Sequence, residues 1–402
     1  MLFLPCPDLL PPEPIIELMH ENKKLSIPCS TVYTVVRMVQ ASWVKLTSDD
    51  STIAEISLSK RILEVCTLKD FVLISTMIFE QTDKGKPLGF KMLEMCKNQG
   101  NLDAEFKYAH ALSKGFESQP RDIPKSLEIL KLLVSKKHAL STYIYALRLI
   151  KQATNPNIGF SNRPLDSVET ASASVDSADT VLNETAKSTE QIDIKMLSQG
   201  LLHLYKAATE LLYPQALMQL GHLYLTGTLG VQKDAAKAYE LFEKAANKDI
   251  VEAMFLCGSC WEKGEGVEGS DMNKAIDWWM KAANRGLAIA QHNIAATYFS
   301  PPENSKIAKS IPIALEYFEM AAMQNLQLSL MNLAKLYKEG YVPLSGEPSD
   351  WKISVDVAKA RQYVEKVAGG DWDDIRLHFL EEVDTIERSE NNKSKQKRGW
   401  LW

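Results

Sequence analysis

Two cysteines stand at a spacing that thiol chemistry uses, Cys257 and Cys260 in the stretch Cys-Gly-Ser-Cys. Such a pair can act as a redox couple or can supply half of a zinc site. A zinc site needs two more ligands at suitable spacing, and none follows in the sequence. The other cysteines are too scattered for a disulfide framework: Cys6, Cys29, Cys66 and Cys96. We therefore expect no metal ion, and the pair is left between a redox role and core packing.

Little else in the sequence has the form of a catalytic or cofactor site. The histidines are isolated from one another: His20, His110, His138, His203, His222, His292 and His378. No HExxH, GxSxG, Walker or Rossmann pattern occurs. The adjacent Trp278 and Trp279 could line a cofactor, but bulky aromatic residues in a helical pattern more often belong to a core. We expect a protein that is not an enzyme, with no catalytic residue and no cofactor.

The element that carries these residues is a unit of 37 residues that occurs twice between Pro214 and Gly286. Ten residues of the first copy are repeated identically in the second: Ala216, Gly221, Gly227, Asp234, Lys237, Ala238, Lys244, Ala245, Ala246 and Asn247 fall on Ala253, Gly258, Gly264, Asp271, Lys274, Ala275, Lys281, Ala282, Ala283 and Asn284. A period of about 20 to 50 residues is typical of a repeat array, in which each unit buries its apolar face against its neighbours.

Each unit predicts two helices. The first begins at Pro214, where a missing N–H costs nothing, and its apolar residues recur at helical spacing to about Leu225. The second begins at Asp234, whose carboxylate can accept hydrogen bonds from the N–H groups of the first turn. Gly227 and Gly230 give the intervening loop its backbone freedom. Alanine and glycine recur where the two helices would press closest, so a larger side chain there would overpack the contact.

The unit resembles tetratricopeptide repeats and their longer relatives, the Sel-one-like repeats (SLR). The patterns LGxxY at 220–224 and AxxxF at 238–242 suit both types. The length of 37 residues, the GxGV loop at 264–267 and the alanine pair 282–283 followed by Gly286 are similar to the Sel-one-like type. The resemblance implies an all-α fold, a right-handed α-solenoid of stacked antiparallel helix pairs.

The repeat register favours core packing for the cysteine pair. Cys257 takes the place of Leu220, and Cys260 takes the place of Leu223. A free cysteine packs as a small hydrophobic residue, which fits these positions. We assign the following positions to the repeat framework: Ala216, Gly221, Tyr224, Ala253, Gly258, Trp261, Ala290, Tyr298 and Tyr337.

Fainter copies extend the array in both directions, and one of them is interrupted. Its first helix has Ser141 and Ala146 at the alanine and glycine positions, while its second helix is expected only at 196–212. Residues 161–190 in between hold ten Ser or Thr and no aromatic residue, a composition that cannot bury enough apolar surface to fold. Such a segment can act as a spacer or as a phosphorylated regulatory loop.

The expected parts of the chain follow from this array. They are an N-terminal helical segment (1–66, with helices near 13–22, 31–45 and 51–66), degenerate helical repeats (67–151), a disordered Ser/Thr-rich insert (152–191), Sel-one-like repeats (192–370), a capping helix (371–389) and a basic, Trp-ended tail (390–402).

The composition is that of an ordinary soluble protein, with 45% hydrophobic and 24% charged residues and a net charge of -5. This balance gives no support for nucleic acid as a partner. No apolar run approaches the ~20 residues that span a bilayer. The N-terminus lacks a basic stretch before its apolar start, and the first arginine is Arg37, so neither a secretory signal nor a mitochondrial presequence is expected. We expect an intracellular, soluble protein that is not secreted, cytoplasmic by default and mitochondrial as the second choice.

The resemblance implies an adaptor that holds members of a larger complex together, as family members do in ER degradation complexes, chitin-synthase activation and respiratory-chain assembly. We predict a non-enzymatic protein-protein interaction scaffold. The alternative is a mitochondrial respiratory-complex assembly factor with a redox-active cysteine pair. The tail adds a candidate peripheral membrane contact, because Trp400 and Trp402 stand beside several basic residues.

The first helices of such arrays line an inner, concave surface, which is where a partner helix or extended peptide would bind. Two series of residues fall on this side of the repeats. They give the predicted binding residues Met218, His222, Phe255, Ser259, His292, Met331 and Lys335, with Glu262 as a flanking polar group. Methionine and aromatic rings beside polar groups make an adaptable surface. The alternative is that the apolar members of the series pack against the next helix.

The insert gives the first testable prediction. Brief protease treatment should cut within 161–190 before it cuts anywhere in 192–370, because this segment lacks core-forming residues. Mass spectrometry of the early fragments measures the order of cutting. Protection of 161–190 against cleavage would contradict the prediction.

Overall fold

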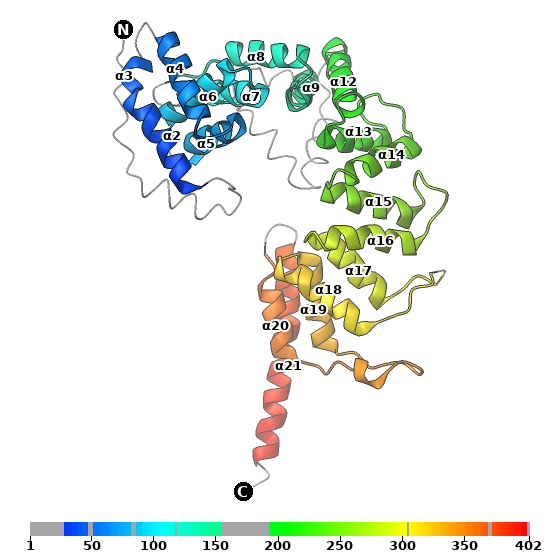
Figure 1. Ribbon diagram of the computed structural model, residues 1–402. Coiled ribbons are helices and arrows are strands. Elements are labelled where there is room, and N and C mark those ends of the chain that lie inside the picture. Colours follow the sequence, from blue (N-terminus) through cyan, green and yellow to red (C-terminus); the bar gives the residue numbers. More distant parts are fainter. Residues whose placement is uncertain are drawn as a thin grey trace. The chain divides into compact units, whose positions relative to one another are not determined.

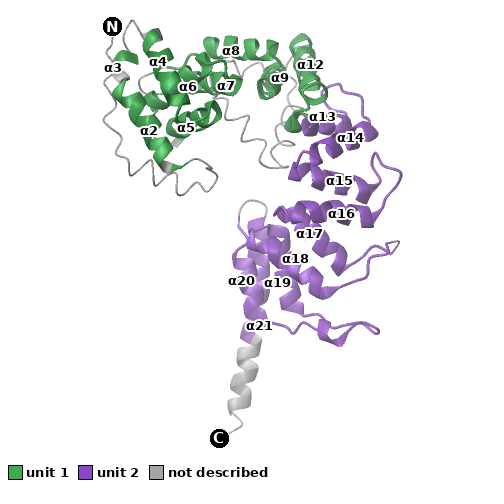
Figure 2. Ribbon diagram, in the orientation of Figure 1, with its two compact units in different colours: residues 1–216 green, residues 217–402 purple. Residues whose placement is uncertain are grey.

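The computed structural model describes residues 28–46, 51–81, 86–116, 119–154, 193–303, 305–368 and 372–399 (Figure 1). These residues form helices joined by turns and loops, with two isolated β-bridges. Helices that follow one another in the chain pack together as neighbours. The all-α class predicted from the sequence is confirmed. The chain divides into two compact units, residues 1–216 and 217–402 (Figure 2).

The first unit, residues 1–216, contains the helices of the N-terminal segment and of the degenerate repeats. These are α2 (Cys29–Ala41), α3 (Trp43–Leu46), α4 (Ser51–Leu63), α5 (Leu68–Gln81), α6 (Lys86–Asn98), α7 (Leu102–Lys114), α8 (Ile123–Ser135), α9 (Ala139–Thr154) and α12 (Ile194–Thr209).

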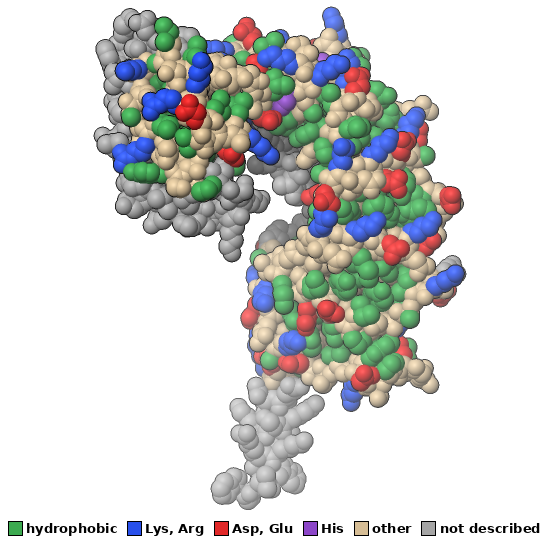
Figure 3. All heavy atoms as spheres, in the orientation of Figure 1, with side chains coloured by type: hydrophobic (Ala, Val, Ile, Leu, Met, Phe, Trp, Pro, Cys, Tyr) green, Lys and Arg blue, Asp and Glu red, His purple; other side chains and the backbone are tan. Residues whose placement is uncertain are grey.

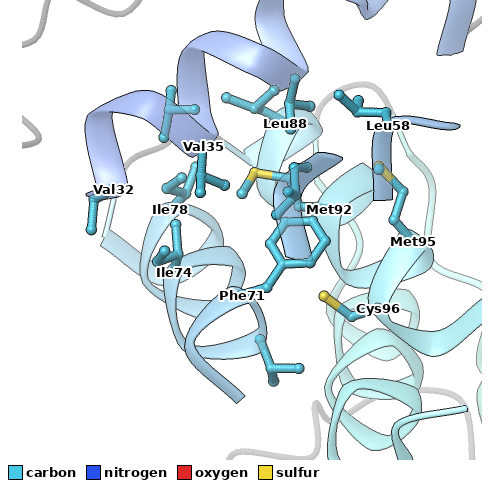
Figure 4. Packing of buried hydrophobic residues seen from close by; sticks show 14 of the residues in the cluster. Val32, Val35, Leu58, Phe71, Ile74, Ile78, Leu88, Met92, Met95 and Cys96 are labelled. Carbon is cyan, nitrogen blue, oxygen red and sulfur yellow. The ribbon is translucent and has the colours of Figure 1, made fainter. Parts of the chain in front are cut away.

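The core of the first unit joins α2, α4, α5 and α6 (Figure 4). Phe71 and Ile74 of α5 are buried together with Val35 of α2 and Met92 of α6. Burial of such side chains stabilises the fold by roughly 1.5 to 3 kcal/mol each. These helices, together with Leu46 of α3 and Ala104 of α7, thus share one apolar cluster at the start of the described chain.

The predicted helix boundaries of the N-terminal segment need correction. The helix expected over 31–45 is interrupted at Ser42, whose backbone N–H bonds to the carbonyl of Val39 three residues earlier and so closes a tight turn. The helix expected over 51–66 ends at Leu63. The helix expected at 13–22 lies outside the described residues.

The interrupted repeat is a helix pair, α9 and α12, that packs together although 39 residues lie between Thr154 and Ile194 in the sequence. The backbone N–H of Asp193 donates to the carbonyl of Ala153 at 3.1 Å, so the ends of the two helices meet. The Asp193 side chain also accepts from Met196 N at 3.0 Å, which is why α12 begins before the predicted residue 196. The predicted insert, 152–191, lies almost wholly outside the described residues.

The second unit contains the clear repeats. Its helices are α13 (Pro214–Thr226, whose first turn holds the unit boundary), α14 (Ala235–Ala246), α15 (Val251–Lys263), α16 (Met272–Ala283), α17 (Ala288–Phe299), α18 (Ile311–Met323), α19 (Gln327–Glu339), the 3-10 turn η2 (Ser349–Trp351), α20 (Val357–Glu365) and α21 (Trp372–Gly399).

Aspartate caps start the second helix of the repeats, as the sequence predicts. Asp234 Oδ1 accepts from Lys237 N at 3.0 Å, and Asp271 Oδ1 accepts from Asn273 N at the same distance. The hydrogen bond from the Lys237 backbone N–H is the main cause that lowers the pKa of the Asp234 carboxyl. At the other end, α15 ends at Gly264 with φ of +72°, a conformation that favours glycine.

The two helices of a clear repeat meet at a glycine and an aromatic ring. A Cβ on Gly221 would lie 2.6 Å from Cε1 of Phe242, and one on Gly258 would lie closer still to the ring of Trp279. Real Cβ atoms do not approach carbon this closely. The helix pair can therefore reach its spacing only without a side chain at this position.

The end of the array is closed by α20 and α21. Phe379 and Val383 of α21 are buried against Val357 and Val364 of α20. Arg361 of α20 bonds to Glu387 at 2.9 Å and to Asp384. The predicted capping helix, 371–389, is part of a longer helix that extends to Gly399. Its side chains are described only as far as Arg388.

The glycine contact gives the second prediction. Gly258→Leu should lower the free energy of unfolding by about 1 to 3 kcal/mol, because its side chain must displace the Trp279 ring. The exposed control Lys263→Ala should change it by about 0.5 kcal/mol or less. Urea unfolding measures both variants, and equal effects would refute the glycine contact.

Candidate functional site

Three first helices of the second unit each place one of the predicted binding residues in a half-buried position. These are Phe255 in α15, His292 in α17 and Met331 in α19, which we call the stripe. The ring of Phe255 stacks on that of Trp279, with centroids 6.4 Å apart. The Trp279 Nε1–H donates to the carbonyl of Phe255 at 3.2 Å. The buried tryptophan of α16 thus fixes the first member of the stripe.

His292 connects the stripe to the helices that follow. Its Nδ1 lies 2.8 Å from Oγ of Ser329 in α19, and its ring meets that of Phe318 edge to face at 5.4 Å. Burial lowers the pKa of His292 from its usual value, so the ring is neutral at neutral pH. Met331 packs against two core clusters, one that includes Phe318 and one that includes Ala334. The stripe is therefore partly core and partly accessible.

The second row of predicted residues is more polar and more open. Ser259 and Glu262 on α15 are half-buried, and Lys335 on α19 is exposed. Burial raises the pKa of the Glu262 carboxyl. A carboxylate that has lost part of its hydration gains from a positive or hydrogen-bonding group brought by a partner. This row supplies the polar edge of the stripe.

On α13, the residues at the two equivalent positions, Met218 and His222, are buried. Met218 is 7% exposed and His222 is 5% exposed. The His222 ring packs edge to face on Phe242, with centroids 5.3 Å apart. The structure thus brings Phe255, His292 and Met331 into equivalent half-open positions and leaves these two residues within the packing. A binding role for all eight residues stays a prediction.

The framework aromatic residues have lysine partners that the sequence analysis did not identify. Lys274 Nζ lies 3.8 Å from the ring centroid of Trp261, and Lys359 Nζ lies 4.0 Å from that of Tyr337. Lys237 lies over Tyr224 at 5.5 Å. A cation over an aromatic face contributes about 0.5 to 1 kcal/mol at exposed sites. The sequence could have shown two of these pairs, because Tyr224 and Lys237 recur 37 residues later as Trp261 and Lys274.

The cysteine pair of α15 lies in the core, as the repeat register predicts. Cys257 is fully buried and Cys260 is 3% exposed. Burial is the main cause that raises the pKa of both thiols, for Cys260 to about 11. A thiol that attacks disulfides or binds metal needs the opposite shift. Among the described residues, no group of three or more His, Cys, Asp and Glu side chains could hold a metal ion.

Hydrophobic and charged side chains are unevenly distributed over the face of the second unit that Figure 3 shows. Hydrophobic side chains gather over α17 and α18, whereas charged side chains of both signs lie over α14 to α16. On α18, Met323 is 82% exposed and Met320 is 38% exposed. No helix in the described ranges combines the length and apolar character required to cross a membrane.

Comparison with known proteins identifies the repeats. Four segments match the Sel1 repeat model: residues 102–138, 214–250, 251–287 and 288–326. These four segments are Sel1 repeats, and the first coincides with a degenerate copy predicted from the sequence. A Sel1 repeat protein from Oxalobacter formigenes has the same fold, with a TM-score of 0.51 and 18% identity over 75% of this chain and 98% of that chain.

Three curated proteins are similar to parts of this chain. Chitin synthase regulatory factor 3 of Schizosaccharomyces pombe is 28% identical over 138 residues, 34% of this chain and 14% of that protein. Chitin synthase regulator SKT5 of Saccharomyces cerevisiae is 25% identical over 248 residues, 58% and 34% of the two chains. Cytochrome c oxidase assembly factor 7A of Xenopus laevis is 28% identical over 132 residues, 32% and 56% of the two chains.

The chain spans 14% and 34% of the lengths of the two chitin synthase regulators. The four Sel1 repeats of this chain indicate a scaffold for protein interaction. The resemblance to Sel-one-like repeats predicted from the sequence is confirmed.

The buried thiols give the third prediction. In the native protein at pH 7.5, Cys257 and Cys260 should react with a thiol reagent far more slowly than a free cysteine, because burial keeps them protonated and covered. Unfolding in guanidinium should make both react at once. Absorbance titration with and without denaturant measures this, and rapid native labelling of either residue would support the redox alternative instead.

Proposed function

We propose that the chain is a non-enzymatic scaffold that binds one or more partner proteins and supports the assembly of a larger complex. The observation that carries this proposal is the stripe. Its members Phe255, His292 and Met331 stand at the same position of successive repeats and are all half-open. A repeated position that is only partly covered within the array offers a row of contacts to a second chain.

The chemistry of the stripe favours a partner helix or an extended peptide. Phe255 and Met331 supply apolar contact area, and methionine adapts to differently shaped side chains. Glu262 and Lys335 supply one charge of each sign at the edge. Apolar anchors with polar groups beside them match the side-chain spacing of an amphipathic segment.

A second candidate is a mitochondrial respiratory-complex assembly factor, which the similarity to the cytochrome c oxidase assembly factor favours. It differs from the first candidate in compartment and in the proposed use of the cysteine pair. The buried, protonated thiols weigh against the redox part of this proposal. Cell fractionation of the tagged chain separates a mitochondrial location from the cytoplasmic one that we propose by default. The same fractions test for membrane contact through the basic tail.

The stripe gives the fourth prediction. Phe255→Ala combined with Met331→Ala should weaken partner binding by about 2 kcal/mol, as the loss of central anchors does. Partners are captured with the tagged wild-type chain, and the affinity of a captured partner is then measured by titration. Thermal melting is recorded in parallel, because Phe255 contacts Trp279 and Met331 contacts the core. A loss of several kcal/mol of stability would show that the stripe is core.

A charge-reversal pair gives a control that spares the core. Lys335→Glu combined with Glu262→Lys should reduce binding of the same partner and leave the melting temperature close to that of the wild type, since Lys335 is exposed and Glu262 is half-exposed. Lys248→Glu, an exposed change away from the stripe, should leave both quantities unchanged. Equal binding by all variants would contradict the proposed surface.

A further inference from the structure

The helix pair of α9 and α12 has an unusual charge. Neither helix contains an aspartate or a glutamate, although the whole chain holds 51 acidic residues and 46 basic ones. The pair carries four basic residues: Arg148, Lys151, Lys195 and Lys206. In a chain of net charge -5, this pair forms a local positive surface.

Arg148 stands where the other repeats place a core residue. It follows Ala146 by two positions, just as Leu223 follows Gly221 by two. The residues at the equivalent position of the other repeats are all buried: Ala111, Leu223, Cys260, Thr297 and Leu336. An arginine at this position is a departure from the packing rule of the array.

The guanidinium of Arg148 has lost solvent without gaining a partner. The residue is half-buried, and burial alone lowers its pKa. No described residue forms a hydrogen bond or an ion pair with it. Among the described residues, the side-chain nitrogen atoms of Arg148 are not among the fully buried polar atoms without a hydrogen-bond partner. They therefore remain within reach of solvent. A partly desolvated charge without an opposite charge lowers the stability of the folded state.

The described residues beside Arg148 on α9 and α12 carry no negative charge. Tyr145 and Gln152 lie on the same side of α9, three positions before and four positions after it. The ring of His203 on α12 meets the Tyr145 ring at 5.3 Å between centroids, and Lys206 lies one turn further along α12. The buried Oε1 of Gln152 and Nδ1 of His203 have no hydrogen-bond partner. Among the described residues, the surroundings therefore lack an anion for Arg148.

We propose that the α9–α12 pair forms an oxyanion-binding site centred on Arg148. The site takes a carboxylate or a phosphate group carried by a partner protein, because a guanidinium binds either group with two parallel hydrogen bonds. The amide of Gln152, one turn along α9, and Lys206, beside His203 on α12, add a polar group and a positive charge to the same helix pair. This site lies on the first unit and does not depend on the stripe of the second unit.

The test uses small anions and the full-length chain. Thermal melting is measured in inorganic phosphate, in acetate and in chloride at equal ionic strength, for the wild type and for Arg148→Leu. Phosphate or acetate should raise the melting temperature of the wild type by about 2 to 4 °C over chloride. Arg148→Leu should lose this gain. In chloride it should melt above the wild type, because it restores the leucine of the repeat and removes an unpaired charge.

Lys195→Leu is the matched control, since it removes one exposed positive charge from the same helix pair. It should keep the gain in phosphate, whereas general stabilisation by phosphate would appear equally in all variants. Arg148→Lys serves as a second variant that keeps the charge, and its apparent affinity for the anion should be about tenfold weaker. A larger gain in phosphate than in acetate assigns the natural group to a phosphate ester, and the reverse assigns it to a carboxylate.

Three outcomes overturn the proposal. The first is an equal anion gain in the wild type and in Arg148→Leu, which would place the effect elsewhere. The second is a lower melting temperature of Arg148→Leu in chloride, which would show that the arginine already has a stabilising role in the unliganded fold. No gain by the wild type in either anion also refutes the site.

Discussion

The repeats depend on the close approach of the two helices in each pair. At Gly221 and Gly258 the hydrogen of a glycine faces an aromatic ring, and no space remains for a methyl group. In the interrupted repeat, Gly200 of α12 faces Ile150 of α9 in a similar way, with 2.8 Å from a Cβ position to Cγ1. Since this contact sets the spacing, it also sets where the Trp279 ring lies. The ring in turn supports Phe255, so the accessible stripe depends on a buried glycine.

Polar groups add further contacts between the helices that the glycine contact brings together. Lys237 shows how one residue serves several of these contacts. Its backbone N–H donates to the Asp234 cap, its ammonium group pairs with the same carboxylate at 2.9 Å, and that group lies over the ring of Tyr224 on the preceding helix. In the repeat that contains Tyr298, Ile313 occupies the lysine position, and Ser310 caps the helix instead. The array therefore tolerates loss of the cation as long as the cap is kept.

The sequence could predict what depends on period and local chemistry. The spacing of 37 residues locates Gly221 and Gly258, and the aspartates locate the helix starts, because caps act within one turn. The period could not predict how far neighbouring helices cover each position. Met218 and Phe255 are equivalent in sequence, yet only Phe255 is half-open. Arg148 is recognisable as a misplaced charge only after the degenerate copy is aligned with the clear ones, and its lack of a partner is a three-dimensional property.

The hydrogen bond from Asp193 to Ala153 has a consequence for the integrity of the chain. It joins two helices whose shared contacts are buried, among them Ile150, Leu204 and Ala208. These contacts do not require a covalent connection between the helices. A single break in the connecting segment would convert the protein into two polypeptides that stay associated, one ending after α9 and one beginning before α12. Such a nicked form would migrate as one species under native conditions and as two in detergent, so the first unit would behave as a naturally split domain.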